Sequence, residues 1–250
     1  MTPKVDFIDS ERVSIDGQEG IYLWDQSSLL RQILNRLKSI GAEKFFSDPS
    51  RDAQRSRESL AIYFFVSALK KESGRDQWIL QPHDDPPDFV VMTFDEDPIV
   101  FTLDQFELVE INDRCETFDE VMSVLDRKIK KGYPKNLNLL IFINHENSKT
   151  WVDLLYKQLE ADVSFRSIWT VHLLFKNESQ VYSAIVNRIR PTMMTIAADF
   201  DDSDVHRRGN PPGFTEIVKT EKGMFVQLRK EYADELRKTI LKAKLRIRRG

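Results

Sequence analysis

The sequence predicts an α/β fold with a central mixed β-sheet flanked by helices, preceded by N-terminal helices and followed by a long C-terminal helix. Two observations carry this prediction. Two strand-like runs separated by a short proline-containing turn indicate a hairpin, and a helix, strand, helix, strand order follows them. A hairpin is antiparallel, whereas strands joined through a helix usually run parallel, so the sheet must be mixed.

The N-terminal part is expected to be mainly helical. After an irregular start with one short strand at 20–24, the segment 27–40 has apolar residues at helical spacing, and Gly41 ends it. A second helix covers 51–71 and stops before Gly74. Across its second half it is apolar around most of its circumference, which places it in the core.

The sheet is expected to begin after these helices. A short strand at 78–80 precedes the loop 81–87, whose prolines exclude regular structure. Strands at 88–94 and 99–111 then form the hairpin around the turn 95–98. Whether the strand at 99–111 is continuous or interrupted at Asp104 is left open.

The alternating elements complete the core. They are, in chain order, a helix at 118–131, a strand at 137–143, a helix at 151–160, and strands at 168–175 and 180–189. The strand at 137–143 is apolar throughout, which is typical of a strand buried on both faces.

The expected organisation is one main domain with a tail. Residues 1–76 form a helical part packed on an α/β core at 77–200, and 201–250 form an acidic loop and a basic helix. In the last segment, apolar residues at helical spacing predict one long helix over 220–249.

Composition narrows the class of protein. Hydrophobic residues make up 41% and charged residues 31% of 250 positions, and the net charge is −3, which suits a globular protein and not a polycation. No apolar run reaches the ~18 residues of a membrane span, and no leader pattern is present, so we expect a cytoplasmic protein. The single cysteine, Cys115, excludes an internal disulfide, and we interpret it as an ordinary thiol.

The acidic residues of the hairpin are the best candidates for chemistry. If the turn is tight and Phe94 faces Ile99, Asp88 faces Gln105 and lies diagonal to Glu107, about 7 Å away between backbones. Side chains alternate along a strand, so these acids share one face and lie within reach of one metal ion.

Other interpretations of these acids remain open. A register shifted by one residue presents Asp104 and Glu110 instead, although we interpret both as surface residues. Asp88 could simply cap a turn after the prolines, and Glu107 could face solvent.

The block of proline, Asp88, hairpin, second acid, helix and buried strand resembles the PD-(D/E)xK superfamily of restriction-endonuclease-like nucleases over roughly residues 78–145. The resemblance implies that Asp88 and Glu107 bind Mg²⁺ or Mn²⁺ and that the substrate is DNA. Hard oxygen ligands of this kind suit Mg²⁺. Val109 occupies the position where the family has its lysine.

The resemblance also suggests where the missing groups come from. Lys128 lies at the edge of the apolar face of the following helix, with Lys131 further round, and either lysine could reach back over the sheet. An acid from an early helix often joins such sites, and Glu58 is the candidate, with Glu43 behind it. An ordinary solvated helix face is the competing interpretation for both lysines.

The alternative to an enzyme is a non-enzymatic interaction or nucleic-acid-binding protein on the same scaffold, which the valine at position 109 favours. The C-terminal helix would then contact a protein partner or a second copy of the chain. Four of its basic residues are candidates for DNA phosphate contacts: Lys242, Lys244, Arg246 and Arg248. A small-molecule enzyme has no residue constellation in its favour, and His83 with its neighbouring aspartates is interpreted as a solvated loop.

Overall fold

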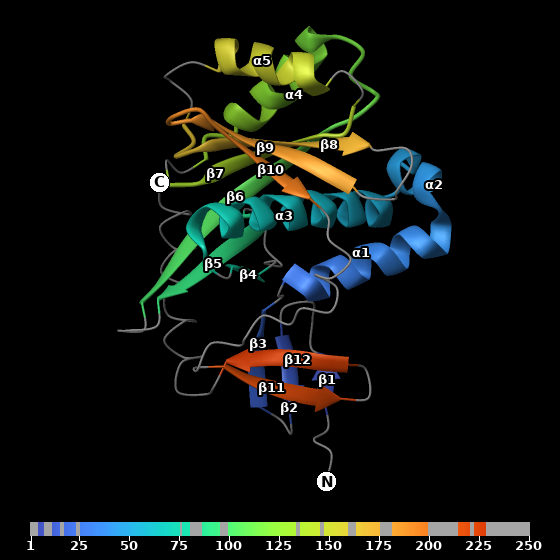
Figure 1. Ribbon diagram of the computed structural model, residues 1–250, viewed down its shortest axis with the longest axis vertical. Helices are drawn as coiled ribbons and strands as arrows, with labels where there is room; N and C mark the ends of the chain where they lie inside the picture. Colours follow the sequence, from blue (N-terminus) through green and yellow to red (C-terminus); the bar gives the residue numbers. More distant parts are fainter. Residues whose placement is uncertain are drawn as a thin grey trace.

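The computed structural model shows a helix-flanked sheet and a second, smaller sheet at one end of the long axis (Figure 1). It describes residues 5–7, 12–15, 18–23, 26–75, 77–80, 87–95, 100–133, 136–145, 148–159, 164–175, 182–199, 215–220 and 223–228. Both sheets and all five helices named below lie within these ranges.

The central sheet has seven strands and is mixed, as the sequence predicts. In chain order they are β4 (Gln77–Leu80), β5 (Phe89–Asp95), β6 (Val100–Ile111), β7 (Asn138–Ile143), β8 (Ile168–Phe175), β9 (Tyr182–Arg190) and β10 (Met194–Asp199). Their spatial order is β10-β9-β8-β7-β6-β5-β4. The pairs β6–β7 and β7–β8 are parallel, and the others are antiparallel.

Helices cover both faces of this sheet. They are α1 (Gln26–Ile40), α2 (Ala42–Ser47), α3 (Arg51–Ser73), α4 (Phe118–Ile129) and α5 (Ser148–Gln158). Figure 1 shows α4 and α5 above the sheet, with α3 and α1 below it. Strand β7 is buried on both sides and divides two cores, with Leu140 and Phe142 in the α1/α3 core and Leu139 and Ile141 in the α4/α5 core.

Local signals fix the ends of helices α3 and α4. Ser50 caps α3 by accepting a hydrogen bond from the Ala53 N–H, and Gly74 ends it with a left-handed φ of 69°. Thr117 and Glu120 form a capping box at the start of α4. Each predicted helix of the core is therefore present within a few residues of its expected bounds.

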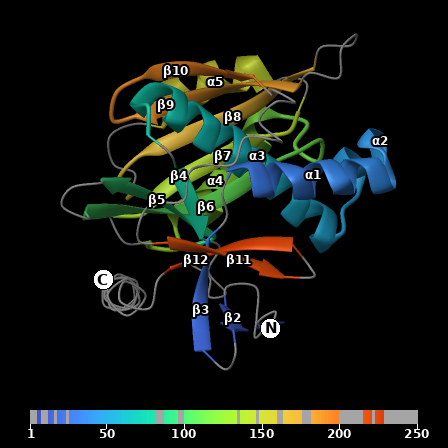
Figure 2. The same cartoon turned by 60° about the horizontal axis from the view of Figure 1, so that its bottom comes forward.

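The second sheet was not predicted. It contains β1 (Val5–Phe7), β2 (Arg12–Ile15), β3 (Gln18–Leu23), β11 (Thr215–Thr220) and β12 (Gly223–Leu228), in the order β1-β2-β3-β12-β11. Strands from the two ends of the described chain thus share one sheet, and Figure 2 shows β11 and β12 crossing in front of the N-terminal strands.

Three expectations are corrected by these strands. The N-terminal part is not only helical, because β1–β3 precede α1. The predicted helix at 220–249 is wrong at its start, where β12 pairs with β11 and β3 through long-range contacts that helical spacing cannot reveal. The rest of that segment, from residue 229 onward, lies outside the described residues. Strand β10 was also missed.

The hairpin register differs from the predicted one by two residues. Asp95 pairs with Val100 and Phe89 with Phe106, so Val90, and not Asp88, lies opposite Gln105. The hairpin pairing extends to Asp95 and Val100, so the connection begins and ends one residue later than predicted. Because the shift is an even number, each β6 side chain keeps its predicted face.

Candidate active site

The candidate site lies where β5 begins, next to the part of β6 that β5 does not cover. Pairing between the two strands stops at Phe89 and Phe106, and no described strand covers that side of β6 beyond this point. Asp88 makes the last contacts. Its backbone N–H donates to the Phe106 carbonyl at 2.9 Å, and its Oδ2 accepts from the Leu108 N–H at 2.6 Å. Asp88 therefore touches the residues on both sides of Glu107.

Glu107 is the most deeply buried acid of the site, with 0% exposure. Its Oε1 accepts from the Lys128 ammonium and from the Tyr133 hydroxyl, the latter at 2.6 Å. Its Oε2 is buried and has no hydrogen-bond partner among the described residues. One carboxylate oxygen is thus held by two donors while the other is left without one.

The position of Lys128 agrees with the sequence-based expectation that it reaches back over the sheet. Its amine comes from the last turn of α4, and a quarter of its side chain remains exposed. Val109 is packed in the α4/α5 core, where a lysine would place its stem among apolar side chains. The Lys131 amine lies 5.8 Å from the centre of the Tyr133 ring and does not occupy the same place.

Glu58 approaches the same edge from α3, on the other side of the sheet. Burial raises the pKa of the half-buried Glu58, and the nearby Glu110 carboxylate adds to this; the hydrogen bond from Gln54 and the charge of Lys128 act in the opposite direction. Lys128 therefore acts electrostatically on acids from both faces. Glu43, the acid expected behind Glu58, is exposed on α2.

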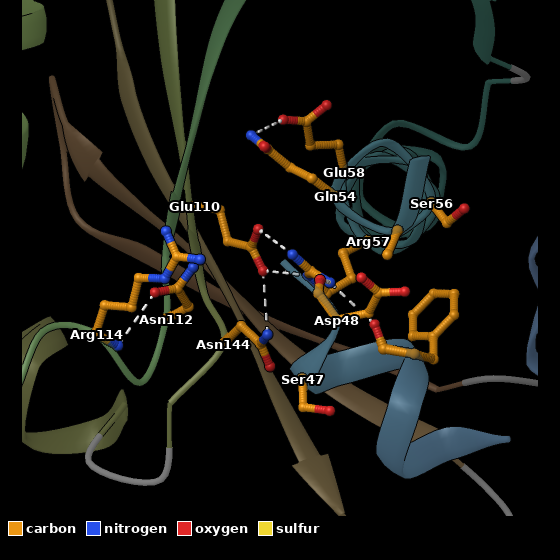
Figure 3. A network of polar contacts seen from close by, with 12 residues as sticks. Ser47, Asp48, Gln54, Ser56, Arg57, Glu58, Glu110, Asn112, Arg114 and Asn144 are labelled. Atoms are coloured by element: carbon orange, nitrogen blue, oxygen red, sulfur yellow. Dashed lines mark hydrogen bonds and ion pairs between the residues drawn. The ribbon is translucent and has the colours of Figure 1, made fainter. Parts of the chain in front are cut away.

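Glu110 is not the surface residue that the sequence suggested. Its side chain is 4% exposed, and both its oxygens accept from Arg57, at 2.6 and 3.2 Å (Figure 3). Asn144 donates to the same carboxylate at 3.1 Å, and Arg57 also donates to the carbonyls of Phe45 and Asp48. This network ties the α2–α3 connection to the ends of β6 and β7.

Sequence reasoning missed Arg57 and Tyr133. Arg57 precedes Leu60 and Ala61 by three and four residues, so it lies on the buried face of α3. A buried arginine needs an acidic partner, so the position of Arg57 on this apolar face could have predicted a buried ion pair. Tyr133 follows Gly132, which has a φ of 68° at the end of α4, and no sequence pattern marked its hydroxyl.

The remaining candidate acid of the hairpin and the only cysteine of the sequence lie in separate environments. Asp104, the alternative ligand of a shifted register, is partly exposed and pairs with Arg166 at 3.0 Å. Cys115 is buried, and burial raises the pKa of its thiol, which disfavours the nucleophilic thiolate. His83 and the basic residues at 242–248 lie outside the described residues.

The site matches the ligand preference of a hard divalent cation only in part. Within the described residues, no three histidine, cysteine or acidic side chains gather closely enough to hold a metal. Mg²⁺ often uses only one or two carboxylates, with water and substrate phosphate completing its shell. Asp88 and Glu107, whose buried Oε2 has no partner among the described residues, supply two carboxylates, which is the number that this smaller requirement asks for.

No protein-family model matches this chain, and no curated protein or solved structure is significantly similar to it. Among the helices that are described, none has both the length and the apolar character needed to cross a bilayer.

Proposed function

We propose that this protein is a metal-dependent nuclease that hydrolyses phosphodiester bonds in DNA, with Asp88, Glu107 and Lys128 as its central residues. One observation carries the proposal: Lys128 contacts a fully buried glutamate whose second oxygen has no partner among the described residues. A purely structural ion pair has no need of an unsatisfied oxygen, which costs about 1–3 kcal/mol when buried.

The arrangement of elements supports the same proposal. The run α3, β4, β5, β6, α4, β7 has a helix on one face, an antiparallel meander, a helix on the other face and a parallel neighbour for β6. This contains every element of the block that resembles the restriction-endonuclease-like core, with Asp88 directly before β5 and Glu107 on the neighbouring strand β6.

In the proposed site, Asp88 and Glu107 Oε2 hold Mg²⁺ or Mn²⁺. The bound ion supplies charge neutralisation at the phosphate and a lowered pKa of the attacking water. Tyr133 and Lys128 fix the Oε1 side of Glu107 and so orient the carboxylate. Glu58, on which the charge of Lys128 acts, is the further acid of the proposed site.

Lys128 has a second role in this proposal. Its partly exposed ammonium can face a phosphate that arrives from solvent, and its charge stabilises the negative charge that develops there. The attacking water gives up a proton to solvent as its oxygen bonds to phosphorus, a P–O bond to a sugar oxygen breaks, and the leaving oxygen gains a proton from solvent. Lys242, Lys244, Arg246 and Arg248 are proposed to bind DNA phosphates outside the reacting centre.

A second candidate is a DNA-binding protein without nuclease activity. Val109 favours it, because the strand position that carries lysine in the family is part of the apolar core here. In that case the Glu107–Lys128 pair only joins α4 to the sheet, and DNA binding occurs without cleavage.

A plasmid-nicking assay tests the proposal. Purified wild type is incubated with supercoiled DNA and Mg²⁺ or Mn²⁺, beside Asp88→Asn, Glu107→Gln and Lys128→Met. Each substitution is expected to lower the nicking rate at least ~100-fold, the lower range for losing one group that stabilises developing charge. Asp104→Asn, on the same strand but in a surface ion pair, is the matched control and should retain activity.

The result that contradicts the proposal is equally concrete. Nicking that survives both Asp88→Asn and Glu107→Gln removes this site from the reaction. Wild type that binds DNA in a gel-shift assay, yet cleaves it with neither ion, supports the second candidate instead.

A further inference from the structure

Gln105, like Glu107 on the same strand, has a buried side-chain oxygen without a hydrogen-bond partner among the described residues. Gln105 is 7% exposed, and its Oε1 has no hydrogen-bond partner among the described residues. It lies two positions before Glu107 on β6, so both side chains emerge from the same face of the sheet, toward α4. Two buried acceptors without donors therefore lie next to each other along one strand.

The backbone beneath Gln105 is firmly held. Its carbonyl accepts from the Asn138 side-chain amide at 3.0 Å, and its Cα is paired with Val90 on β5. The unsatisfied oxygen is thus not explained by a loosely placed residue. Elsewhere in the sheet, buried Gln77 has the same 7% exposure, but its Oε1 accepts from the Thr93 hydroxyl.

Neighbouring acceptors, one of them on a carboxylate, are complementary to a cation. Amide and carboxylate oxygens are the ligands that hard divalent cations take from proteins. A neutral amide adds a ligand without adding negative charge, so it suits a place where Glu107 already lies in the interior.

We propose that Gln105 is a further ligand of the divalent cation and holds it through Oε1 beside Glu107 Oε2. This inference rests on the proposed function, because it concerns the same ion. It extends that function by assigning a metal-binding role to a residue outside the acid pair and the lysine.

The test measures Mn²⁺ binding and stability separately. Mn²⁺ binding to wild type and Gln105→Met is followed by calorimetry and by the electron paramagnetic resonance signal of the free ion. Methionine has a similar length and lacks the oxygen, so Mn²⁺ affinity is expected to fall about 10-fold or more. Gln105→Glu restores an oxygen and should recover most of that affinity.

The melting temperature without metal gives the second readout. Gln105→Met removes an unsatisfied acceptor, so its melting temperature should match or exceed that of wild type by ~2–4 °C. Gln77→Met is the matched control: it leaves the Thr93 hydroxyl without its acceptor, so it should melt lower while binding Mn²⁺ as wild type does.

The outcomes separate this inference from the proposed function. Wild type that binds no Mn²⁺ overturns both. If wild type binds Mn²⁺ and Glu107→Gln abolishes this, but Gln105→Met binds as tightly as wild type, only the role of Gln105 is overturned. In that case a buried water, which has two donors, is the better partner for the two oxygens.

Discussion

Glu107 and Glu110 are two buried carboxylates three residues apart on β6, and they have opposite surroundings. Glu110 faces α3, and its oxygens accept from Arg57 and Asn144. Glu107 faces α4, takes two donors on Oε1 and has none on Oε2 among the described residues. The first is a satisfied ion pair, and the second has an unsatisfied acceptor.

The difference teaches how to separate structural from functional charges in this fold. A buried charge that serves architecture is expected to use all of its hydrogen-bonding capacity, because any unused part costs stability. A carboxylate kept for a ligand must leave an oxygen available. By this reasoning Glu110 belongs to the fold and Glu107 to the proposed site.

The largest expected effect comes from Arg57→Met. This change leaves the Glu110 carboxylate buried without its counter-charge and removes the donors to the Phe45 and Asp48 carbonyls. The free energy of unfolding should fall by about 3–5 kcal/mol, the usual cost of breaking a buried pair. Urea denaturation measures it.

The control for Arg57 is Arg166→Met, which breaks an exposed arginine–aspartate pair. Its cost should stay below ~1 kcal/mol. If both arginine variants lose the same stability, the Arg57–Glu110 pair has no special structural importance, and the contrast between the two glutamates fails.

A smaller effect is expected for Glu107→Gln, compared directly with Glu110→Gln. The amide at position 107 leaves Lys128 free to turn toward solvent, so the free energy of unfolding should change by less than ~1 kcal/mol or rise. The same change at position 110 leaves Arg57 buried with a weaker acceptor and should cost about 2–3 kcal/mol. Equal costs in denaturant titrations would show that both glutamates are structural.

The sequence predicted the central sheet well because its signals are local. Apolar runs, glycine ends and strand alternation specified α1, α3, α4, β7 and β8. Pairing between distant segments left no such signal. The joining of β12 to β3, and the identification of β10 as an edge strand, depend on contacts that no local window contains.

The candidate site shows the same limit. Alternation gave the correct face for Glu107, and helical spacing placed Lys128 at the edge of α4. The two-residue register shift depends on where the hairpin turn begins, and the Tyr133 hydrogen bond depends on where the chain leaves α4. Burial of Glu110 required the partner Arg57, whose position on an apolar helix face was visible in the sequence but was not used.

The third prediction concerns Glu58, the acid near both contrasted glutamates. Because its pKa is raised in the fold, Glu58 binds its proton more readily there than in the unfolded chain. Its contribution to stability is present below the unfolded pKa of about 4.3 and is lost as pH rises through the folded value. Glu58→Gln should therefore gain stability relative to wild type between pH 4 and 7.

Thermal unfolding at several pH values measures this gain, which is modest because Glu58 is only half-buried. Gln54 can still donate to the new amide oxygen, so the local hydrogen bond is preserved. A constant difference between the two proteins across this pH range would mean that the fold does not raise the pKa of Glu58.

The smallest expected effect is at His172, which tests whether any unsatisfied buried group marks a site. Its Nδ1 has no partner among the described residues, and burial lowers the pKa of the imidazole. A lowered pKa means that stability is present above the unfolded value of about 6.5 and is lost as pH falls below it. His172→Leu should therefore unfold like wild type at pH 7.5 and be the more stable protein at pH 5.5, with Mn²⁺ affinity unchanged. The oxygens of Gln105 and Glu107 lie two positions apart on one strand and include a negative charge, whereas the His172 nitrogen is isolated. Reduced Mn²⁺ affinity in the His172→Leu variant would show that this distinction does not identify a metal site.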